Sequence, residues 1–201
     1  GDATSEQLEA SAQLVAKYSR GEARVTHSQN LVLPWVPENQ LFDLWQEAKS
    51  LGLASSNIGL LNDMIACPGG DYCALANARA IPVAAAISER YQDLDELDDL
   101  GPIDLHISGC INSCGHHHSG HIGILGVDKD GKEWYQVTLG GSDGSNLSGA
   151  AGPGKVVGPS FSAAEVPGVI EAVLNKYLEL RLPSQEANGR AEHFIETLRR
   201  V

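Results

Sequence analysis

The sequence has no apolar run near the roughly 18 residues that a membrane-spanning helix needs. It is also poor in positive charge, because 14 Lys and Arg stand against 26 Asp and Glu and leave a formal net charge of −12. A chain with this balance lacks the basic surface that nucleic acids or anionic bilayers attract, so we expect neither as a partner. The first six residues show neither the basic start nor the apolar core of a secretory signal. We therefore expect a cytoplasmic protein.

Cysteine is scarce as well, with four residues in 201: Cys67, Cys73, Cys110 and Cys114. Four cysteines permit two disulfides, but disulfide frameworks are typical of small secreted domains, and a chain of this length can bury a core without them. The cysteines therefore favour metal binding or redox chemistry.

Apolar spacing, capping signals and turn residues predict a mixed series of helices and strands. The first predicted elements are a helix from a capping box at Thr4 and Gln7 to Gly21, an extended segment over 23–33, a helix over 41–51 and a strand over 58–65. They are followed by a helix from Ala74 that Pro82 kinks or divides, a solvated acidic linker over 93–99 and a half-buried strand over 103–107. The last predicted elements are a hairpin of strands 121–127 and 132–139, a glycine-rich loop over 140–160, a helix over 165–180 and a helix over 191–200.

The cysteines form two pairs, Cys-x5-Cys and Cys-x3-Cys, with 36 residues between Cys73 and Cys110. Four converging thiolates bind zinc or an iron–sulfur cluster rather than a hard cation. Glycines adjoin both pairs and permit close backbone approach to a bulky cofactor. Structural zinc sites usually separate paired ligands by two to four residues, so the first pair fits zinc poorly. A cluster is the favoured interpretation, and a structural zinc protein remains an alternative.

These motifs resemble a known family. Cys67-Pro68-Gly69 with Cys73, and then the run from Ser108 to Gly115 (Ser-Gly-Cys-Ile-Asn-Ser-Cys-Gly), look like the signature of the assimilatory sulfite and nitrite reductases, hemoproteins that couple a [4Fe-4S] cluster to siroheme. The run Arg24 to Asn30 is similar to the segment of that family that contacts the tetrapyrrole, and similarity continues over 135–141 and the closing helix.

The resemblance implies a role for each of these residues. All four cysteines would ligate the cluster, and the sulfur of Cys114 would also be the axial ligand of the siroheme iron, so that one thiolate joins the two cofactors. Asn112 would shape their environment. Thr26, Gln29 and Asn30 would offer hydrogen bonds to the macrocycle or its carboxylates, and Arg24 would add positive charge. From the residues alone, Thr26 and Asn30 could equally cap strand ends.

The resemblance further implies an α/β (α+β) fold, with a ferredoxin-like half-domain over 1–56 followed by a mixed-sheet siroheme and [4Fe-4S] binding domain over 57–201. It covers only the C-terminal half of the family enzyme, which reduces sulfite to sulfide or nitrite to ammonia with six electrons. The expected partners are the anion, a ferredoxin or flavoprotein donor, and the missing N-terminal half, without which we expect no activity. The alternative is an iron–sulfur electron-transfer or cofactor-binding module with no substrate chemistry of its own.

Two further motifs carry less weight. Four histidines between His116 and His121 could bind a metal, but neighbouring side chains in an extended loop point in different directions. We expect them to face solvent or cofactor, with one orienting a cluster thiolate. The run 149–155 has the Gly-x4-Gly-Lys spacing of a phosphate loop, but Val156 replaces the magnesium-binding Ser or Thr. We expect only a flexible loop there.

Overall fold

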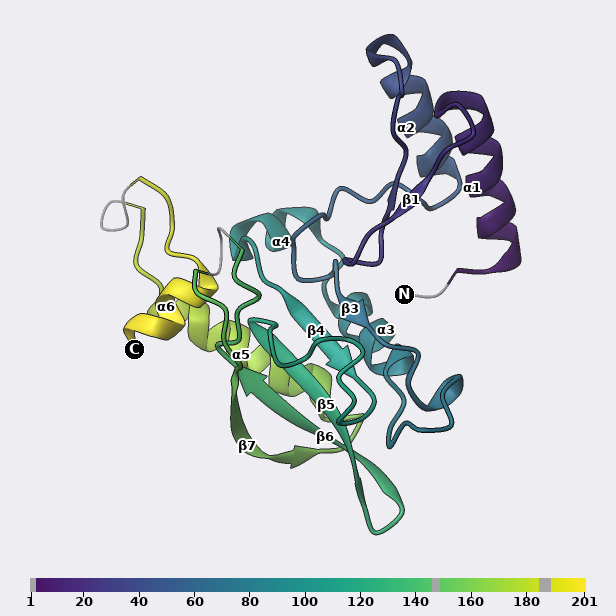
Figure 1. Ribbon diagram of the computed structural model, residues 1–201. Coiled ribbons are helices and arrows are strands. Elements are labelled where there is room, and N and C mark those ends of the chain that lie inside the picture. The colour runs from purple at the N-terminus through teal and green to yellow at the C-terminus, as the bar shows by residue number, and fades with distance from the viewer. Residues whose placement is uncertain (1–2, 146–148, 185–188) are drawn as a thin grey trace. The chain divides into compact units, whose positions relative to one another are not determined.

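Two units of unequal size make up the chain, Gly1–Ile58 (unit 1) and Gly59–Val201 (unit 2). The structure is a computed structural model that describes residues 3–145, 149–184 and 189–201 (Figure 1). Within these residues, no helix is long and apolar enough to cross a membrane.

Unit 1 is a helix, a short hairpin and a second helix. Helix α1 (Ser5–Tyr18) begins at the predicted capping box, where the Thr4 side chain accepts from the Gln7 N–H and the Gln7 side chain accepts from the Thr4 N–H. Strands β1 (Arg24–Val25) and β2 (Leu31–Val32) pair antiparallel, so the expected extended segment folds back on itself. A 3-10 turn, η1 (Glu38–Gln40), leads into α2 (Leu41–Ser50), close to the predicted bounds.

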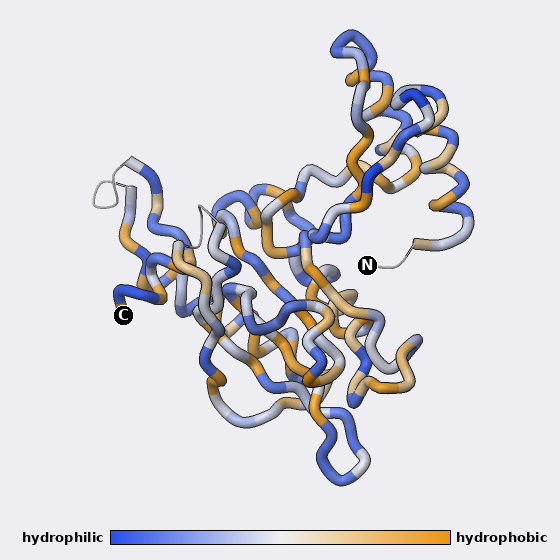
Figure 2. The backbone as a smooth tube through the Cα atoms, in the orientation of Figure 1, coloured by the Kyte–Doolittle hydropathy of each residue, from blue (hydrophilic) through white to orange (hydrophobic). Residues whose placement is uncertain are grey.

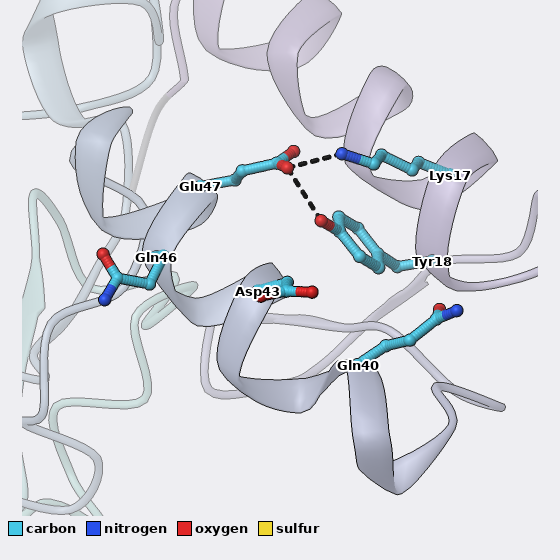
Figure 3. Close-up of a pocket in the computed structure, with 6 residues that line it drawn as sticks. All are labelled: Lys17, Tyr18, Gln40, Asp43, Gln46 and Glu47. Carbon is cyan, nitrogen blue, oxygen red and sulfur yellow. Dashed lines mark hydrogen bonds and ion pairs between the residues drawn. The ribbon is translucent and has the colours of Figure 1, made fainter.

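Polar side chains line a pocket of about 330 Å³ between the two helices of unit 1 (Figure 3). Glu47 of α2 accepts hydrogen bonds from Lys17 Nζ at 2.5 Å and from the Tyr18 hydroxyl at 2.7 Å. These bonds lower the pKa of Glu47. The hydrogen bonds of Lys17 and Tyr18 to Glu47, called the polar tie below, therefore join α1 to α2 beside the pocket.

Unit 2 is built on a five-stranded mixed sheet in the order β3-β4-β5-β6-β7. Its strands are β3 (Ile65–Ala66), β4 (Leu105–Ser108), β5 (Ile122–Lys129), β6 (Lys132–Leu139) and β7 (Lys155–Phe161). β3, β4 and β5 are parallel, while β6 and β7 run antiparallel to their neighbours. The predicted hairpin is confirmed, and its hydrophilic tip extends beyond the sheet (Figure 2).

Helices complete unit 2: α3 (Ile81–Arg90), α4 (Leu94–Leu100), α5 (Val166–Leu180) and α6 (Phe194–Arg200), with a 3-10 turn η2 (Gly69–Asp71). α3 and α5 pack together, and α5 lies behind the strands in Figure 1. A single hydrophobic cluster joins Ile107 and Ile124 of the sheet to Ile170 and Leu174 of α5. Helices and a mixed sheet thus confirm the α/β (α+β) prediction.

Two helix predictions were wrong. The helix expected from Ala74 begins at Ile81, with Pro82 in its first turn, where a missing N–H costs nothing and the fixed φ suits the helix. The acidic stretch is not a linker but α4, capped by the Asp93 side chain, with Leu97 and Leu100 buried. Leucines spaced three residues apart signalled this helix despite the surrounding charge.

Three strand predictions also need correction. Of the strand expected over 58–65, only Ile65 joins the sheet, together with the following Ala66. The strand expected to be half-buried, β4, is buried at all four residues, because it lies between two parallel neighbours. Part of the expected glycine-rich loop, including Lys155 and Val156, forms β7, so the phosphate-loop spacing lies partly in a strand. Residues 146–148 of that loop lie outside the described residues.

Candidate [4Fe-4S] centre

The two cysteine loops follow two neighbouring parallel strands of unit 2. Cys67 comes directly after β3, and Cys110 follows β4 by two residues. Ala66 pairs with Ile107, and the Cys67 N–H donates to the Ile107 carbonyl at 3.0 Å, which extends the ladder by one residue. Because the carboxyl ends of parallel strands lie at the same edge of a sheet, this pairing brings the two loops together.

Backbone hydrogen bonds then hold the loops to each other. The Gly109 carbonyl accepts from the N–H groups of Asn77 at 2.9 Å and Ala78 at 3.0 Å. A Cβ on Gly109 would lie 2.5 Å from the Ala78 carbonyl oxygen and 2.9 Å from the Gly69 Cα. The approach is therefore close enough that only glycine fits, as the glycines beside the cysteines suggested.

Gly115 makes a second close approach, directly after Cys114. A Cβ on Gly115 would lie 2.0 Å from the Ile107 carbonyl oxygen and 3.2 Å from the Cys67 nitrogen. The Gly115 N–H donates to the Ser108 hydroxyl at 3.1 Å. The Cys114 end of the second loop is thus pressed against the ends of β3 and β4.

All four cysteines are free thiols. Cys67 and Cys110 are buried, Cys73 is half-buried and Cys114 is exposed. The Gly109 N–H points at the Cys67 sulfur at 3.0 Å, a contact of the kind that is common around metal-bound cysteines.

These features fit a cluster. Four thiols on two loops, clamped by glycine contacts, form the soft donor set that an iron–sulfur cluster takes, and each thiolate would bind a different iron atom. Within the part of the chain that the structure describes, no three His, Cys, Asp or Glu side chains are grouped as ligands of a single metal ion.

The histidine run divides into buried and exposed members, and the expectation that all face solvent or cofactor was wrong. His117 and His121 are each 1% exposed, whereas His116 and His118 are exposed. Burial, with the neighbouring His118 and His106, lowers the pKa of His117 to about 4. Burial likewise lowers the pKa of His121, whose Nδ1 accepts from the Asp104 N–H at 3.2 Å. Which of these rings are buried could not be read from the sequence.

The predicted tetrapyrrole-contacting residues lie in unit 1, on the hairpin. The Thr26 hydroxyl accepts from the Asn30 N–H at 3.0 Å, and the Thr26 N–H donates to the Asn30 carbonyl at 2.9 Å. Gln29 takes a left-handed conformation (φ 60°) in the turn between them. Arg24 is ion-paired with Glu22, its guanidinium 2.6 Å from the carboxylate. These residues share one hairpin, where Thr26 and Asn30 close the turn.

Asn112 and its neighbour Ile111 are exposed in the turn between Cys110 and Cys114. The sequence pointed to no role for Ser113, which lies in this turn, or for His106, which contacts the residues that follow it. The Ser113 hydroxyl lies 3.1 Å from His117 Nδ1, and His106 Nδ1 lies 3.0 Å from the His116 carbonyl oxygen. For His106, the signal available in the sequence was a histidine between the apolar Leu105 and Ile107 of the predicted strand.

Two family descriptions match almost the whole chain. "Nitrite/Sulfite reductase ferredoxin-like half domain" matches residues 1–51, and "Nitrite and sulphite reductase 4Fe-4S domain" matches residues 60–200. The chain belongs to the nitrite and sulfite reductase family. Membership in this family implies a [4Fe-4S] cluster and siroheme as cofactors, and confirms the sequence resemblance.

Relatives within the family include both kinds of reductase. A ferredoxin–nitrite reductase of Synechococcus elongatus is 34% identical over 148 residues, covering 72% of this chain and 28% of the relative. A sulfite reductase [ferredoxin] 1 of Mycolicibacterium paratuberculosis is 31% identical over 183 residues, covering 87% and 32%. The chain thus spans about a third or less of the length of these relatives.

Solved structures agree. The structure of the Mycobacterium tuberculosis NirA protein matches 96% of this chain and 35% of its own, with a TM-score of 0.73 and 26% identity. The dissimilatory sulfite reductase I (DsrI) structure matches the entire chain and 64% of its own at a TM-score of 0.75. At 16% identity the second match concerns the fold alone.

Proposed function

We propose that the chain is the C-terminal half of a siroheme-dependent reductase of sulfite or nitrite. The observation that carries the proposal is the pair of cysteine loops at the carboxyl ends of β3 and β4, clamped by Gly109 and Gly115, in a chain of this family. When bound, the cluster supplies electrons one at a time, and the siroheme supplies an iron to which the anion binds. The reduction takes six electrons in all.

In this proposal Cys67, Cys73, Cys110 and Cys114 hold the cluster. Their burial suits the role, since Cys67 and Cys110 face the protein while Cys114 remains exposed to a second group. Cys114 would also bind the siroheme iron, as the family resemblance implies. Asn112, exposed in the same turn, would lie beside the cofactors.

Unit 1 would act as the ferredoxin-like half-domain. Arg24, Thr26, Gln29 and Asn30 would contact the siroheme from its hairpin. The turn-closing bonds of Thr26 hold the hairpin in shape, and Gln29 is exposed in the turn between Thr26 and Asn30. The domain division proposed for this function lies near residue 57.

Charge supports the proposal that an N-terminal half is missing. The substrates are anions and siroheme carries several carboxylates, so the site needs unpaired Lys and Arg. Eight of the 14 basic residues of this chain already form ion pairs with Asp or Glu: Lys17, Arg24, Arg79, Arg90, Lys176, Arg181, Arg190 and Arg200. Most of the positive charge at the anion site would thus come from the other half.

The names of the relatives favour ferredoxin as the electron donor over a flavoprotein subunit. An acidic chain would repel an acidic ferredoxin, so the donor would dock mainly through the other half. The cytoplasmic location inferred from the sequence remains a prediction.

The test compares this chain alone with the same chain joined to an N-terminal half from a relative. We expect the joined protein to show siroheme absorption bands and to reduce sulfite or nitrite with reduced methyl viologen. The isolated chain should reduce neither. Reduction by the isolated chain would contradict the half-enzyme proposal, and a joined protein that binds cluster but no siroheme would favour the electron-transfer alternative.

A further inference from the structure

The backbone around Cys114 is unusual on both sides. Ser113 and His116 both take left-handed conformations, with φ of 56° and 55°, although neither is glycine. Such conformations are unfavourable for residues with a Cβ and persist where surrounding contacts hold them. Cys114 and Gly115 lie between these two residues, so the direction of the Cys114 side chain depends on how firmly they are held.

His117 holds the Ser113 side. Its Nδ1 shares a hydrogen bond of 3.1 Å with the Ser113 hydroxyl, and its ring is 1% exposed. The backbone of His117 is packed on β5, since a Cβ on Gly123 would lie 2.0 Å from the His117 carbonyl oxygen. The Ser113 hydroxyl is therefore tied to a residue that the sheet itself fixes.

Three contacts hold the carbonyl group of His116, on the other side of Cys114. This carbonyl oxygen is 3.0 Å from His106 Nδ1, and it also accepts from the Ser119 N–H at 3.0 Å and the Ser119 hydroxyl at 3.1 Å. Loss of one of these contacts leaves two others. At Ser113 the N–H donates to the Cys110 carbonyl at 3.2 Å and the carbonyl accepts from the His116 N–H at 2.8 Å. The bond to His117 is the contact that joins Ser113 to a residue packed on β5.

We propose that Ser113 and His117 form a positioning pair that fixes the backbone on the N-terminal side of Cys114, so that its thiol is directed at the cluster before iron binds. The inference rests on the proposed function, because it takes Cys114 as a cluster ligand. His117 acts through Ser113 and is a positioning residue, not a catalytic one.

The first test measures hydrogen exchange in the metal-free 201-residue chain. The amides of Gly115 and His116 are the reporters, because they donate to the Ser108 hydroxyl and the Ser113 carbonyl. We expect Ser113→Ala and His117→Leu each to speed their exchange about tenfold, the effect of one lost hydrogen bond. The double variant should be no worse than either single one, because both remove the same bond.

Two variants serve as controls. Ser119→Ala removes a hydroxyl from the same loop but leaves His116 with its other contacts, so exchange should stay near that of the unchanged chain. His117→Asn places an amide near the position of Nδ1 and should restore most of the protection. The proposed pair would be contradicted if amide exchange in Ser113→Ala equalled that in Ser119→Ala. It would also be contradicted if the effects of the two substitutions were additive in the double variant.

The second test uses the same chains after anaerobic reconstitution with iron and sulfide. In Ser113→Ala and His117→Leu, a chelator should remove the cluster several-fold faster, and the electron paramagnetic resonance spectrum of the reduced cluster should change. Ser119→Ala should match the unchanged chain in both. If the unchanged chain assembles no cluster, the proposed function fails, while amide exchange still decides whether the pair exists.

Discussion

The two units differ in how much apolar surface they bury. Of residues 3–58 in unit 1, four are buried: Leu14, Val15, Tyr18 and Ser19. Eleven large hydrophobic side chains of the same unit are exposed: Leu8, Val25, Leu31, Val32, Trp35, Leu41, Phe42, Trp45, Leu51, Leu53 and Ile58. Unit 2 is more than twice as long, and its described residues, 59–145, 149–184 and 189–201, expose seven such side chains and bury a continuous core. Exposed apolar surface on this scale is typical of a protein interface.

The difference indicates that unit 2 has a core of its own, and it supports the proposal that another surface covers unit 1 in the complete enzyme. A helix–hairpin–helix of this size buries too little surface to offset its loss of conformational entropy. Its match to a half domain agrees with that argument. Unit 2 instead has a sheet on which two cysteine loops can be held at one edge.

We expect the largest difference in the free energy of unfolding from a leucine-to-alanine substitution made once in each unit. Leu105 in β4 is 1% exposed, and Leu41 in α2 is 50% exposed. Leu105→Ala should lower the free energy of unfolding by about 4 kcal/mol, because it leaves a cavity in the core, and Leu41→Ala by less than about 1 kcal/mol. Urea unfolding of both variants checks this. Equal losses would mean that unit 1 has a core of its own.

Glycine substitutions give the next largest difference. Gly115→Ala would place a Cβ against the Ile107 carbonyl, so we expect a loss of about 3 kcal/mol together with loss of iron binding. Gly52 in unit 1 has no atom within 4 Å of its Cβ position, and Gly52→Ala should cost only about 1 kcal/mol for its positive φ. Thermal unfolding and iron content would report both. Normal cluster uptake by Gly115→Ala would contradict the close approach.

Acid should act mainly on unit 2, through Glu192. Arg200, helped by the Leu182 N–H and the Thr197 hydroxyl, lowers the pKa of Glu192 from 4.5 to about 2. Because the folded pKa is the lower one, the stabilisation is full above pH 4.5 and disappears as the pH falls toward 2. Glu192→Gln should lower stability at pH 7 and flatten the acid side of a urea-midpoint curve. Glu179→Gln, which removes a surface carboxylate on α5, should leave the curve unchanged.

The smallest effect is expected at the polar tie of unit 1. Lys17 and Glu47 are both largely exposed, so their ion pair is screened by solvent and salt. Glu47→Gln should shift the unfolding midpoint slightly, and the shift should vanish in high salt, since it removes the partner of Lys17 and Tyr18. A large, salt-independent shift would show that the tie stabilises unit 1 more than its apolar contacts do.

The sequence predicted the elements whose causes are local. Thr4 and Gln7 are three residues apart and mark the start of α1, and the turn at Asp130-Gly131 lies inside the β5–β6 hairpin. The bounds of β3 were wrong and the helix α4 was missed, because both elements depend on packing from elsewhere in unit 2. Leu97 and Leu100 of α4 become buried only when the core is assembled.

The same limit applies to the candidate centre. The cysteines were recognisable from their spacing and the family resemblance, and glycines at 69, 109 and 115 signalled close approach. The sequence led us to expect that one histidine of the run would orient a cluster thiolate, but not which one, and it gave no role to Ser113. The Ser113–His117 hydrogen bond depends on a left-handed backbone and on a buried ring. Neither leaves a pattern in the sequence.

The central claim is that the four cysteines of unit 2 hold a [4Fe-4S] cluster. The most direct measurement is the iron and acid-labile sulfide content of the chain after anaerobic reconstitution, with the electron paramagnetic resonance spectrum of the reduced sample. We predict about four irons and four sulfides per chain, with the signal of a reduced [4Fe-4S] cluster, and their loss when all four cysteines are replaced by alanine. Equal iron, sulfide and signal in the two proteins would contradict the claim.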